Sequence, residues 1–185
     1  PSYAHPQTHP DRLSIIGSLF GLEPARADHC RVLELGCGNG TNLIPMAWSL
    51  PQSEFVGIDL AAQPVAIGNE MLRNVGLTNV RLVHGSVTEV NRDWGTFDFI
   101  IAHGLYSWVP PNVREQILTI CHEGLAPQGI AFVSYNALPG CHLRNMLREM
   151  MLFHVRGFDS AEERIKQSLA FVRFLAEAQD TEDGY

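Results

Sequence analysis

The hydrophobic positions of this chain follow two alternating patterns, one typical of buried strands and the other of helices. Five short apolar runs predict strands, at residues 31–35, 54–58, 80–84, 97–102 and 129–135. Apolar positions three and four apart predict helices over about 11–20, 41–50, 63–76 and 113–121. Because strands and helices alternate, we expect an α/β fold: a doubly wound parallel sheet with strand order 3-2-1-4-5 and helices on both faces.

Beyond residue 135 the pattern is helical only. Segments 142–157 and 160–179 both have helical periodicity, and a capping residue stands just before the second. The sequence predicts no further strand there. We therefore expect one domain over residues 1–158 and a C-terminal helix over residues 159–185.

The first predicted strand runs directly into a turn with glycine at alternate positions. The turn contains Gly36, Gly38 and Gly40, with Glu34 two residues ahead of it. Glycine has no Cβ, so it accepts a positive φ and lets a ligand lie against the backbone. Backbone N–H groups at the start of the next helix, near Thr41 and Asn42, would face that ligand and favour a carboxylate or phosphate. The turn therefore predicts a cofactor site.

An acidic residue follows at the spacing typical of a nucleoside-binding unit. Asp59 directly follows the second predicted strand, nineteen residues after Gly40. An acidic residue about 20 positions beyond such a turn accepts hydrogen bonds from ribose hydroxyls, so we expect a bound nucleoside. A nicotinamide dehydrogenase is a weaker interpretation, because the dinucleotide fingerprint needs a small residue where Thr41 stands.

Residues 32–40 resemble the first motif of the class I S-adenosylmethionine-dependent methyltransferases, h-h-E-x-G-x-G-x-G. The resemblance implies a Rossmann-like sheet, S-adenosylmethionine as cofactor and S-adenosylhomocysteine as product. The family normally adds closing strands 6 and 7, for which this chain offers no candidates. The cofactor contacts that we expect come from the turn and from the ends of strands 2, 3 and 4: Glu34, Gly36, Cys37, Gly38, Gly40, Asn42, Asp59, Leu60, Gly85, Ser86, Val87 and His103.

One of these positions departs from the family pattern. Many members have an aspartate where Ser86 stands, at the expected adenine contact. A hydroxyl accepts a hydrogen bond from the adenine amino group more weakly than a carboxylate does. We therefore expect cofactor affinity to be lower by roughly 1 kcal/mol.

Three further segments narrow the resemblance: residues 2–13, 102–111 and 133–136. Together they are similar to bacterial methyltransferases with an appended methyltransferase regulatory domain, some of which are described as protein-lysine methyltransferases. The resemblance implies that the opening segment folds over the cofactor, which gives Tyr3, Thr8 and His9 a binding role. It also makes residues 159–185 a candidate linker to a regulatory domain. Relatives often have Trp where Cys141 stands, so the pattern departs there from theirs.

The loop after the fourth predicted strand is rich in aromatic and polar residues, and we expect it to form the acceptor pocket. Methyl transfer is an in-line displacement, so positioning donor and acceptor supplies most of the catalysis. The faces of Tyr106, Trp108 and Tyr135 would hold a cationic group. An amine acceptor must also lose a proton, which His103 or Tyr106 would accept. For His103, a helix cap or a cofactor contact is an equally good role.

The first hypothesis is therefore methyl transfer to a protein lysine or another amine. One alternative is a methyltransferase-like module that binds the cofactor without turnover. Another is a small-molecule methyltransferase.

Composition argues against several other classes. The net charge is −7 and no basic cluster is visible, which argues against a nucleic-acid partner. No run approaches the roughly 18 apolar residues of a membrane span, and residues 1–10 lack the regions of a signal peptide. We therefore expect a cytoplasmic protein without a membrane partner. The four cysteines lack C-x-x-C spacing, which argues against a metal site or a disulfide framework. The oligomeric state stays open.

Overall fold

The computed structural model describes residues 4–178, and the chain divides into two compact units, 1–135 and 136–185. We expected a boundary after residue 158 instead. That boundary falls inside the second unit, because α5 (His142–His154) packs against α6 (Ala161–Glu177). A role for the last helix as a linker stays a prediction.

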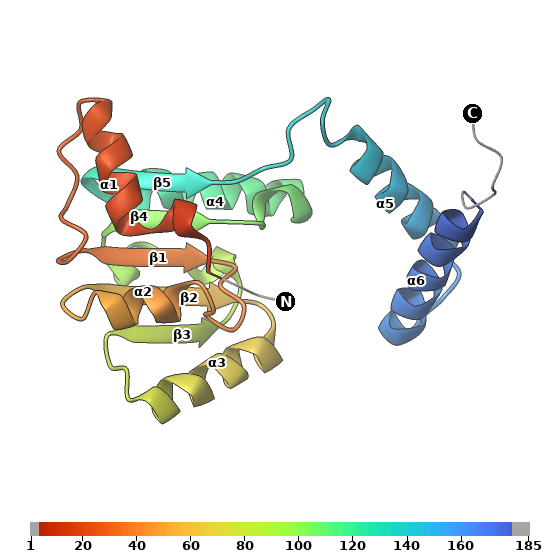
Figure 1. Cartoon of the computed structure of the whole chain (residues 1–185), viewed down its shortest axis with the longest axis horizontal. Helices are drawn as coiled ribbons and strands as arrows, with labels where there is room; N and C mark the ends of the chain where they lie inside the picture. The colour runs from red at the N-terminus through yellow and green to blue at the C-terminus, as the bar shows by residue number, and fades with distance from the viewer. Residues whose placement is uncertain (1–3, 179–185) are drawn as a thin grey trace. The chain divides into compact units, whose positions relative to one another are not determined.

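The first unit is built on a five-stranded parallel sheet in the order β3-β2-β1-β4-β5, as predicted. Its strands are β1 (Arg31–Leu35), β2 (Glu54–Asp59), β3 (Val80–His84), β4 (Phe97–Ala102) and β5 (Leu125–Val133). All strands run the same way, so their carboxyl ends meet at one edge, toward which the arrows point in Figure 1. Open α/β sheets bind their ligands beyond this edge.

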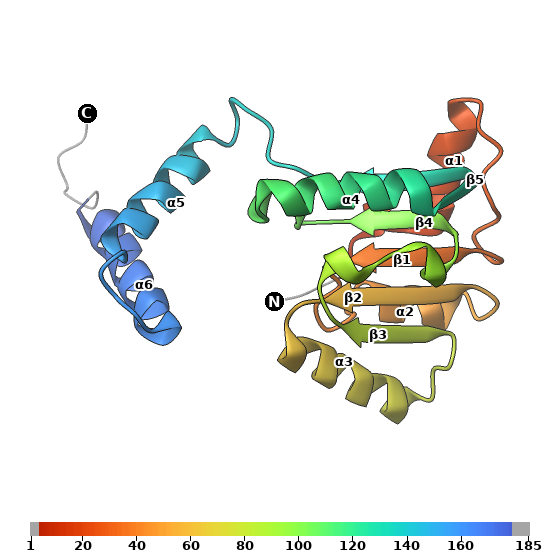
Figure 2. The same cartoon turned by 180° about the vertical axis from the view of Figure 1, so that it is seen from behind.

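Helices cover both faces of the sheet. The α-helices of this unit are α1 (Pro10–Leu19), α2 (Leu43–Ser49), α3 (Ala62–Val75) and α4 (Pro111–Gly124). Four 3₁₀ turns connect elements: η1 (Pro6–Thr8), η2 (Val87–Glu89), η3 (Arg92–Trp94) and η4 (Tyr106–Trp108). Figure 1 shows α1 and α2 in front of the sheet, and the reverse view in Figure 2 shows α4 in front of the other face.

The core consists of two layers because successive strand residues point to opposite faces. Val32 of β1 belongs to the layer shared with α1, α2 and α3, whereas Leu33 belongs to the layer shared with α4. Glu34 is two residues beyond Val32 and therefore points to the same face of the sheet. Its position in β1 therefore directs an acidic side chain into a buried layer.

The last strand differs from the prediction in both bounds. We expected it over residues 129–135, but β5 spans 125–133. Pro127 is typical of a turn, yet an edge strand accommodates proline because its outer N–H groups need no partner in the sheet. The pairing with β4 is irregular here, and Gln128 has a φ of 65°. Tyr135 consequently follows the strand instead of ending it.

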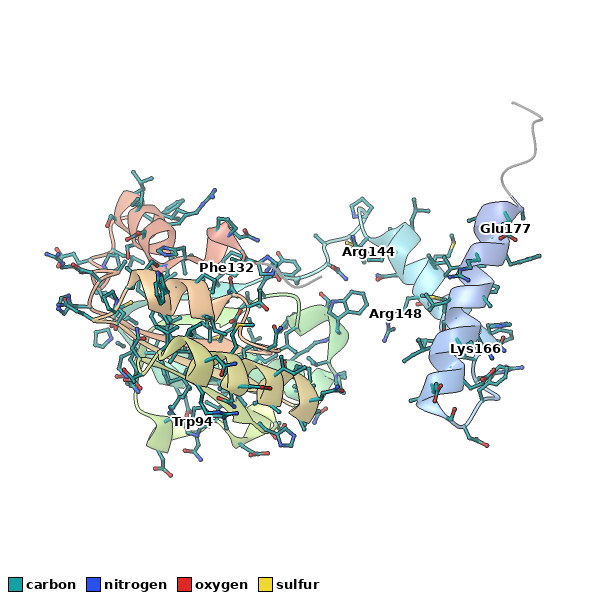
Figure 3. The ribbon with its side chains drawn as sticks, turned by 60° about the horizontal axis from the view of Figure 1, so that its bottom comes forward. Trp94, Phe132, Arg144, Arg148, Lys166 and Glu177 are labelled. Carbon is teal, nitrogen blue, oxygen red and sulfur yellow. The ribbon has the colours of Figure 1, made fainter. Side chains whose placement is uncertain are left out.

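The second unit is helical, as predicted. The side chain of Ser160 caps α6 by accepting a hydrogen bond from the Glu163 N–H at 3.0 Å. Figure 3 labels Arg144 and Arg148 on α5 and Lys166 on α6. No helix within residues 4–178 combines the length and the apolar character that crossing a membrane requires.

Candidate functional site

A cavity of about 390 Å³ lies at the carboxyl ends of β1 and β4. Its walls come from the turn after β1, the loop after β4 and the N-terminal segment: His5, Glu34, Gly36, Cys37, Gly38, Asn39, Thr41, Asn42, His103 and Gly104. The predicted residues among these are Glu34, Gly36, Cys37, Gly38, Asn42 and His103. A second cavity of about 350 Å³, beside η3 and α4, contains none of the predicted residues.

Three of the wall residues were not predicted as site residues from the sequence: His5, Asn39 and Gly104. Gly104 carried a usable signal, because a glycine in the loop just after a strand often marks a positive φ, which here is 68°. His5 carried none, since its place over the turn depends on how the N-terminal segment packs.

Hydrogen bonds within the protein hold the glycine turn. The N–H groups of Gly36 and Cys37 donate to the Ile58 carbonyl oxygen at 2.8 and 3.1 Å. The N–H of Gly38 donates to Asp59 Oδ2 at 2.8 Å. We expected such a turn to grip its ligand with main-chain groups. These three amides instead bind the end of β2, so they give the turn its shape.

The turn glycines have positive φ angles of 76° at Gly36, 57° at Gly38 and 74° at Gly40. A Cβ at Gly40 would lie 2.8 Å from Leu82 Cδ1, so a side chain there would displace the buried Leu82 side chain of β3. At Gly38, by contrast, a Cβ would meet no heavy atom within 4 Å. Gly40 therefore serves packing, whereas Gly38 keeps the cavity open.

The helix after the turn starts later than predicted. It begins at Leu43 instead of Thr41 and is the short helix α2. The N–H of Thr41 donates to Asn39 Oδ1 at 3.4 Å, and the Thr41 hydroxyl donates to the same oxygen. The anion contact that we expected from the amide at position 41 is therefore replaced by a side-chain bond within the turn.

Asp59 stands at the sheet edge, as predicted, and its carboxylate already has two backbone partners. Oδ2 accepts from Gly38, and Oδ1 accepts from the Ala61 N–H at 2.8 Å. Each carboxylate oxygen has about two acceptor positions, so both oxygens keep capacity for a further donor. Asp59 thus fastens the glycine turn and still suits the predicted contact with ribose hydroxyls.

Glu34 is an acidic residue in the core, with only 4% of its surface exposed. Its Oε1 accepts a hydrogen bond from Asn42 Nδ2 at 2.8 Å, while Oε2 is buried and has no partner among the described residues. Burial raises the pKa of Glu34 to about 7; the bond from Asn42 opposes that rise and the charge of Asp59 adds to it. Buried polar atoms are normally paired, so Oε2 suits a donor brought by a ligand.

Cys37 is also buried and lines the same cavity as Glu34. It is 7% exposed, and burial raises the pKa of its thiol, helped by the charges of Glu34 and Asp59. A thiol held in its neutral form is a weak nucleophile. Cys37 therefore contributes an apolar wall to the cavity.

Asn42 ties the N-terminal segment to the cavity. Its Nδ2 donates to Thr8 Oγ1 at 3.0 Å, and its Oδ1 accepts from the His5 N–H at 2.9 Å. Thr8 is fully buried and Asn42 is 5% exposed. The segment around η1 therefore lies against the wall of the predicted cofactor site.

His9, which was also expected to bind from the opening segment, does not line this cavity. His9 caps α1, because its Nδ1 accepts a hydrogen bond from the Asp11 N–H at 3.3 Å. It lines a neighbouring groove with Arg12 and Met46, and that groove shares His5 and Asn42 with the cavity. Tyr3 lies outside the described residues.

His103 follows β4 and faces the N-terminal segment. Its ring centroid lies 4.0 Å from that of His5 and 5.9 Å from that of Phe132, which Figure 3 labels. Its Nδ1 is buried without a partner among the described residues. Burial lowers the pKa of His103 from its ordinary 6.5, and the nearby His5 lowers it further. The neutral form of the imidazole is therefore favoured at pH 7.

The predicted adenine contacts lie beyond the lining of this cavity. Ser86 caps η2: its Oγ accepts from the Thr88 N–H at 3.2 Å, and its N–H donates to Glu89 Oε1 at 3.0 Å. Its hydroxyl is thus engaged locally. Gly85 and Val87 are buried, whereas the Leu60 side chain is 73% exposed. The adenine contacts of Gly85, Ser86 and Val87 and the cofactor contact of Leu60 stay predictions.

The three aromatic residues expected in an acceptor pocket do not line the cavity. Tyr106 packs against the α4 layer of the core, and the Arg114 guanidinium carbon lies 5.9 Å from its ring centroid. Trp108 is 44% exposed and Tyr135 67% exposed. A cation therefore already faces the Tyr106 ring, and it comes from the protein itself.

Residues 32–129, more than half of the chain, match the family model described as a methyltransferase domain. The chain is 38% identical over 175 residues to an uncharacterized protein of Rickettsia prowazekii, covering 95% of this chain and 70% of that protein. It is 29% identical over 119 residues to the trans-aconitate 2-methyltransferase of Deinococcus radiodurans, covering 64% of this chain and 42% of that enzyme.

A solved structure is similar over nearly the whole chain. PKMT2 from Rickettsia typhi in complex with AdoHcy has a TM-score of 0.81 and 36% identity, covering 99% of this chain and 36% of that one. A second uncharacterized protein of Rickettsia prowazekii is 40% identical over 177 residues, covering 96% of this chain and 32% of that protein. The chain thus spans about a third of the length of these two relatives.

Proposed function

This chain belongs to the class I S-adenosylmethionine-dependent methyltransferases, and from that premise we propose that it methylates an amine, with a protein lysine as the first candidate acceptor. Its cofactor is S-adenosylmethionine, which becomes S-adenosylhomocysteine. When bound, the cofactor supplies a methyl group on a positively charged sulfur.

The observation that carries the proposal is the buried, unpartnered Oε2 of Glu34. S-adenosylmethionine has an ammonium group, and we assign Glu34 to bind it, since a charge-assisted hydrogen bond is about twice as strong as a neutral one. Asp59 is assigned to the ribose through its remaining lone pairs. A cavity of about 390 Å³ suits a ligand of this size, and Gly38 leaves room against the backbone.

The remaining contacts follow from position. Gly36, Cys37 and Asn42 line the cavity and are assigned to the methionine half of the cofactor. The segment Gly85–Val87 stands at the end of β3, next to Asp59, and is assigned to adenine.

The choice of an amine acceptor is supported by His103. An amine with a pKa near 10.4 is almost wholly protonated at neutral pH and must lose its proton before it attacks. The neutral imidazole of His103 lines the cavity and has a free nitrogen to receive that proton. With the proton removed, alignment of the nitrogen lone pair with the sulfur–methyl bond supplies most of the rate.

The test is incubation with S-adenosylmethionine that carries a labelled methyl group, together with a bacterial protein extract. We expect label in protein, and we expect it to disappear when the lysines of the extract are first acetylated. A His103→Gln variant should bind S-adenosylhomocysteine as tightly as the wild type but transfer label much more slowly.

Three other outcomes would contradict the proposal. Label confined to the small-molecule fraction would indicate a small-molecule methyltransferase. Label in acetylated proteins would exclude lysine. Binding of S-adenosylhomocysteine without transfer to any fraction would favour a cofactor-binding module.

An Asp59→Ala variant is expected to weaken S-adenosylhomocysteine binding by about 5- to 150-fold, measured by calorimetry. The change removes the ribose acceptor and the anchor of Gly38, which together correspond to about 1–3 kcal/mol. Asp98→Ala is the matched control, because Asp98 also accepts a backbone hydrogen bond, from Arg31 at 2.8 Å, but at the opposite end of the sheet. Equal affinity in Asp59→Ala and wild type would remove Asp59 from the site.

A further inference from the structure

Polar groups from three separate parts of the chain meet at Asn42. Nδ2 of Asn42 donates to Glu34 Oε1 at 2.8 Å and to Thr8 Oγ1 at 3.0 Å. Its Oδ1 accepts from the His5 N–H at 2.9 Å. The Thr8 hydroxyl in turn donates to the His5 carbonyl oxygen at 2.9 Å. One side chain therefore joins β1, the turn before α2 and the N-terminal segment.

Only an amide satisfies all of these partners. The carboxylate of Glu34 requires a donor, and the backbone N–H of His5 requires an acceptor. An aspartate at position 42 would offer no donor, and an aliphatic residue would offer neither group. The burial of Asn42 and Thr8 means that water does not substitute for a lost bond.

We propose that Asn42 is a positioning residue that couples the N-terminal segment to the cofactor cavity, so that ligand binding at Glu34 holds the His5–Thr8 segment in place. The inference rests on the proposed assignment of Glu34 to the ammonium group of the cofactor. Asn42 holds Oε1, which leaves Oε2 as the oxygen that meets the ligand.

The coupling has a physical basis in the strength of one bond. An ammonium group at Oε2 stabilises the ionised carboxylate, and the bond from Asn42 Nδ2 to Oε1 then becomes charge-assisted and stronger. A firmly oriented amide presents Oδ1 to the His5 N–H and Nδ2 to Thr8 at the same time. His5 lines the cavity, so the segment that is held also forms part of the wall.

Hydrogen exchange of a peptide covering residues 4–9 tests the coupling. In the wild type, saturating S-adenosylhomocysteine should slow exchange of this peptide at least about tenfold, because opening of the segment now breaks a stronger network. In Asn42→Ala the ligand should still bind, more weakly, and the slowing should be absent. Saturation is verified for each variant by thermal shift.

Two further variants keep the test interpretable. Thr8→Val preserves side-chain shape and the contact between Asn42 and Glu34; it should bind the ligand within about threefold of wild type but show clearly less slowing. Asn79→Ala is the control, since Asn79 Nδ2 also donates to three backbone oxygens, of Ala47, Leu50 and Ser53, away from the cavity. It should destabilise the fold and keep the full slowing.

The outcomes separate this inference from the proposed function. If the wild type binds S-adenosylhomocysteine without slower exchange, or if Thr8→Val and Asn42→Ala keep the full slowing, the coupling is wrong while the cofactor assignment stands. If Glu34→Gln binds the ligand as tightly as wild type, the assignment of Glu34 fails and the coupling fails with it.

Discussion

Replacing Gly38 with valine is expected to raise the dissociation constant of S-adenosylhomocysteine at least about 100-fold. Gly38 has a φ of 57°, where a β-branched residue is strained by about 1–3 kcal/mol. Its Cβ would also enter the open space of the cavity, where no protein atom lies within 4 Å. The side chain would therefore occupy volume that the ligand needs. Calorimetry measures the loss directly.

Gly21→Val is the matched control for backbone strain. Gly21 has a φ of 82°, and a Cβ there also meets nothing within 4 Å, but it lies in the exposed turn after α1. Both variants should lose similar stability in thermal unfolding, and only Gly38→Val should lose affinity. Equal affinity in the two variants would show that no ligand lies against Gly38.

The free energy of unfolding without ligand is expected to fall by roughly 3 kcal/mol between pH 4.5 and pH 7 because of Glu34. Below pH 4.5 its carboxyl is protonated in both states. Between 4.5 and about 7 the unfolded chain releases the proton while the folded protein keeps it, so stability falls by about 1.36 kcal/mol per unit. Above pH 7 the contribution stays constant. Urea unfolding of wild type and Glu34→Gln at several pH values isolates it, because the variant does not titrate at this position.

Ligand binding should have the opposite dependence on pH. If the ammonium group of the ligand pairs with the ionised carboxylate, affinity for S-adenosylhomocysteine decreases by up to about tenfold per unit below pH 7. Glu34→Gln should bind weakly with a flat profile over this range. A wild-type affinity that does not vary between pH 5.5 and pH 8 would contradict the pairing.

The fold could be predicted from the sequence because its signals are local. The apolar runs of β3 and β4 have the predicted bounds, and Asp59 ends β2 as its spacing to Gly40 required. The glycine turn could be predicted for the same reason, because the tolerance of a positive φ is a property of glycine itself.

The cavity was less predictable because its chemistry depends on long-range packing. The bond between Asn42 and Thr8 joins residues 34 positions apart, and no local pattern indicates it. The surroundings of Tyr106 also depend on packing, because the cation that faces its ring comes from Arg114 on α4. The amides of Gly36 and Cys37 donate to the Ile58 carbonyl oxygen of β2, a pairing between two strands that the local sequence of the turn does not indicate.

β5 is an edge strand, and its irregular start limits how another strand can pair with this edge of the sheet. Pro127 has no N–H to donate, and the left-handed backbone at Gln128 bends the chain out of an extended conformation. Together they interrupt the row of donors and acceptors that would otherwise template edge-to-edge association between copies. Only the segment Ile130–Val133 keeps a regular ladder with β4, so any added strand would have to align there.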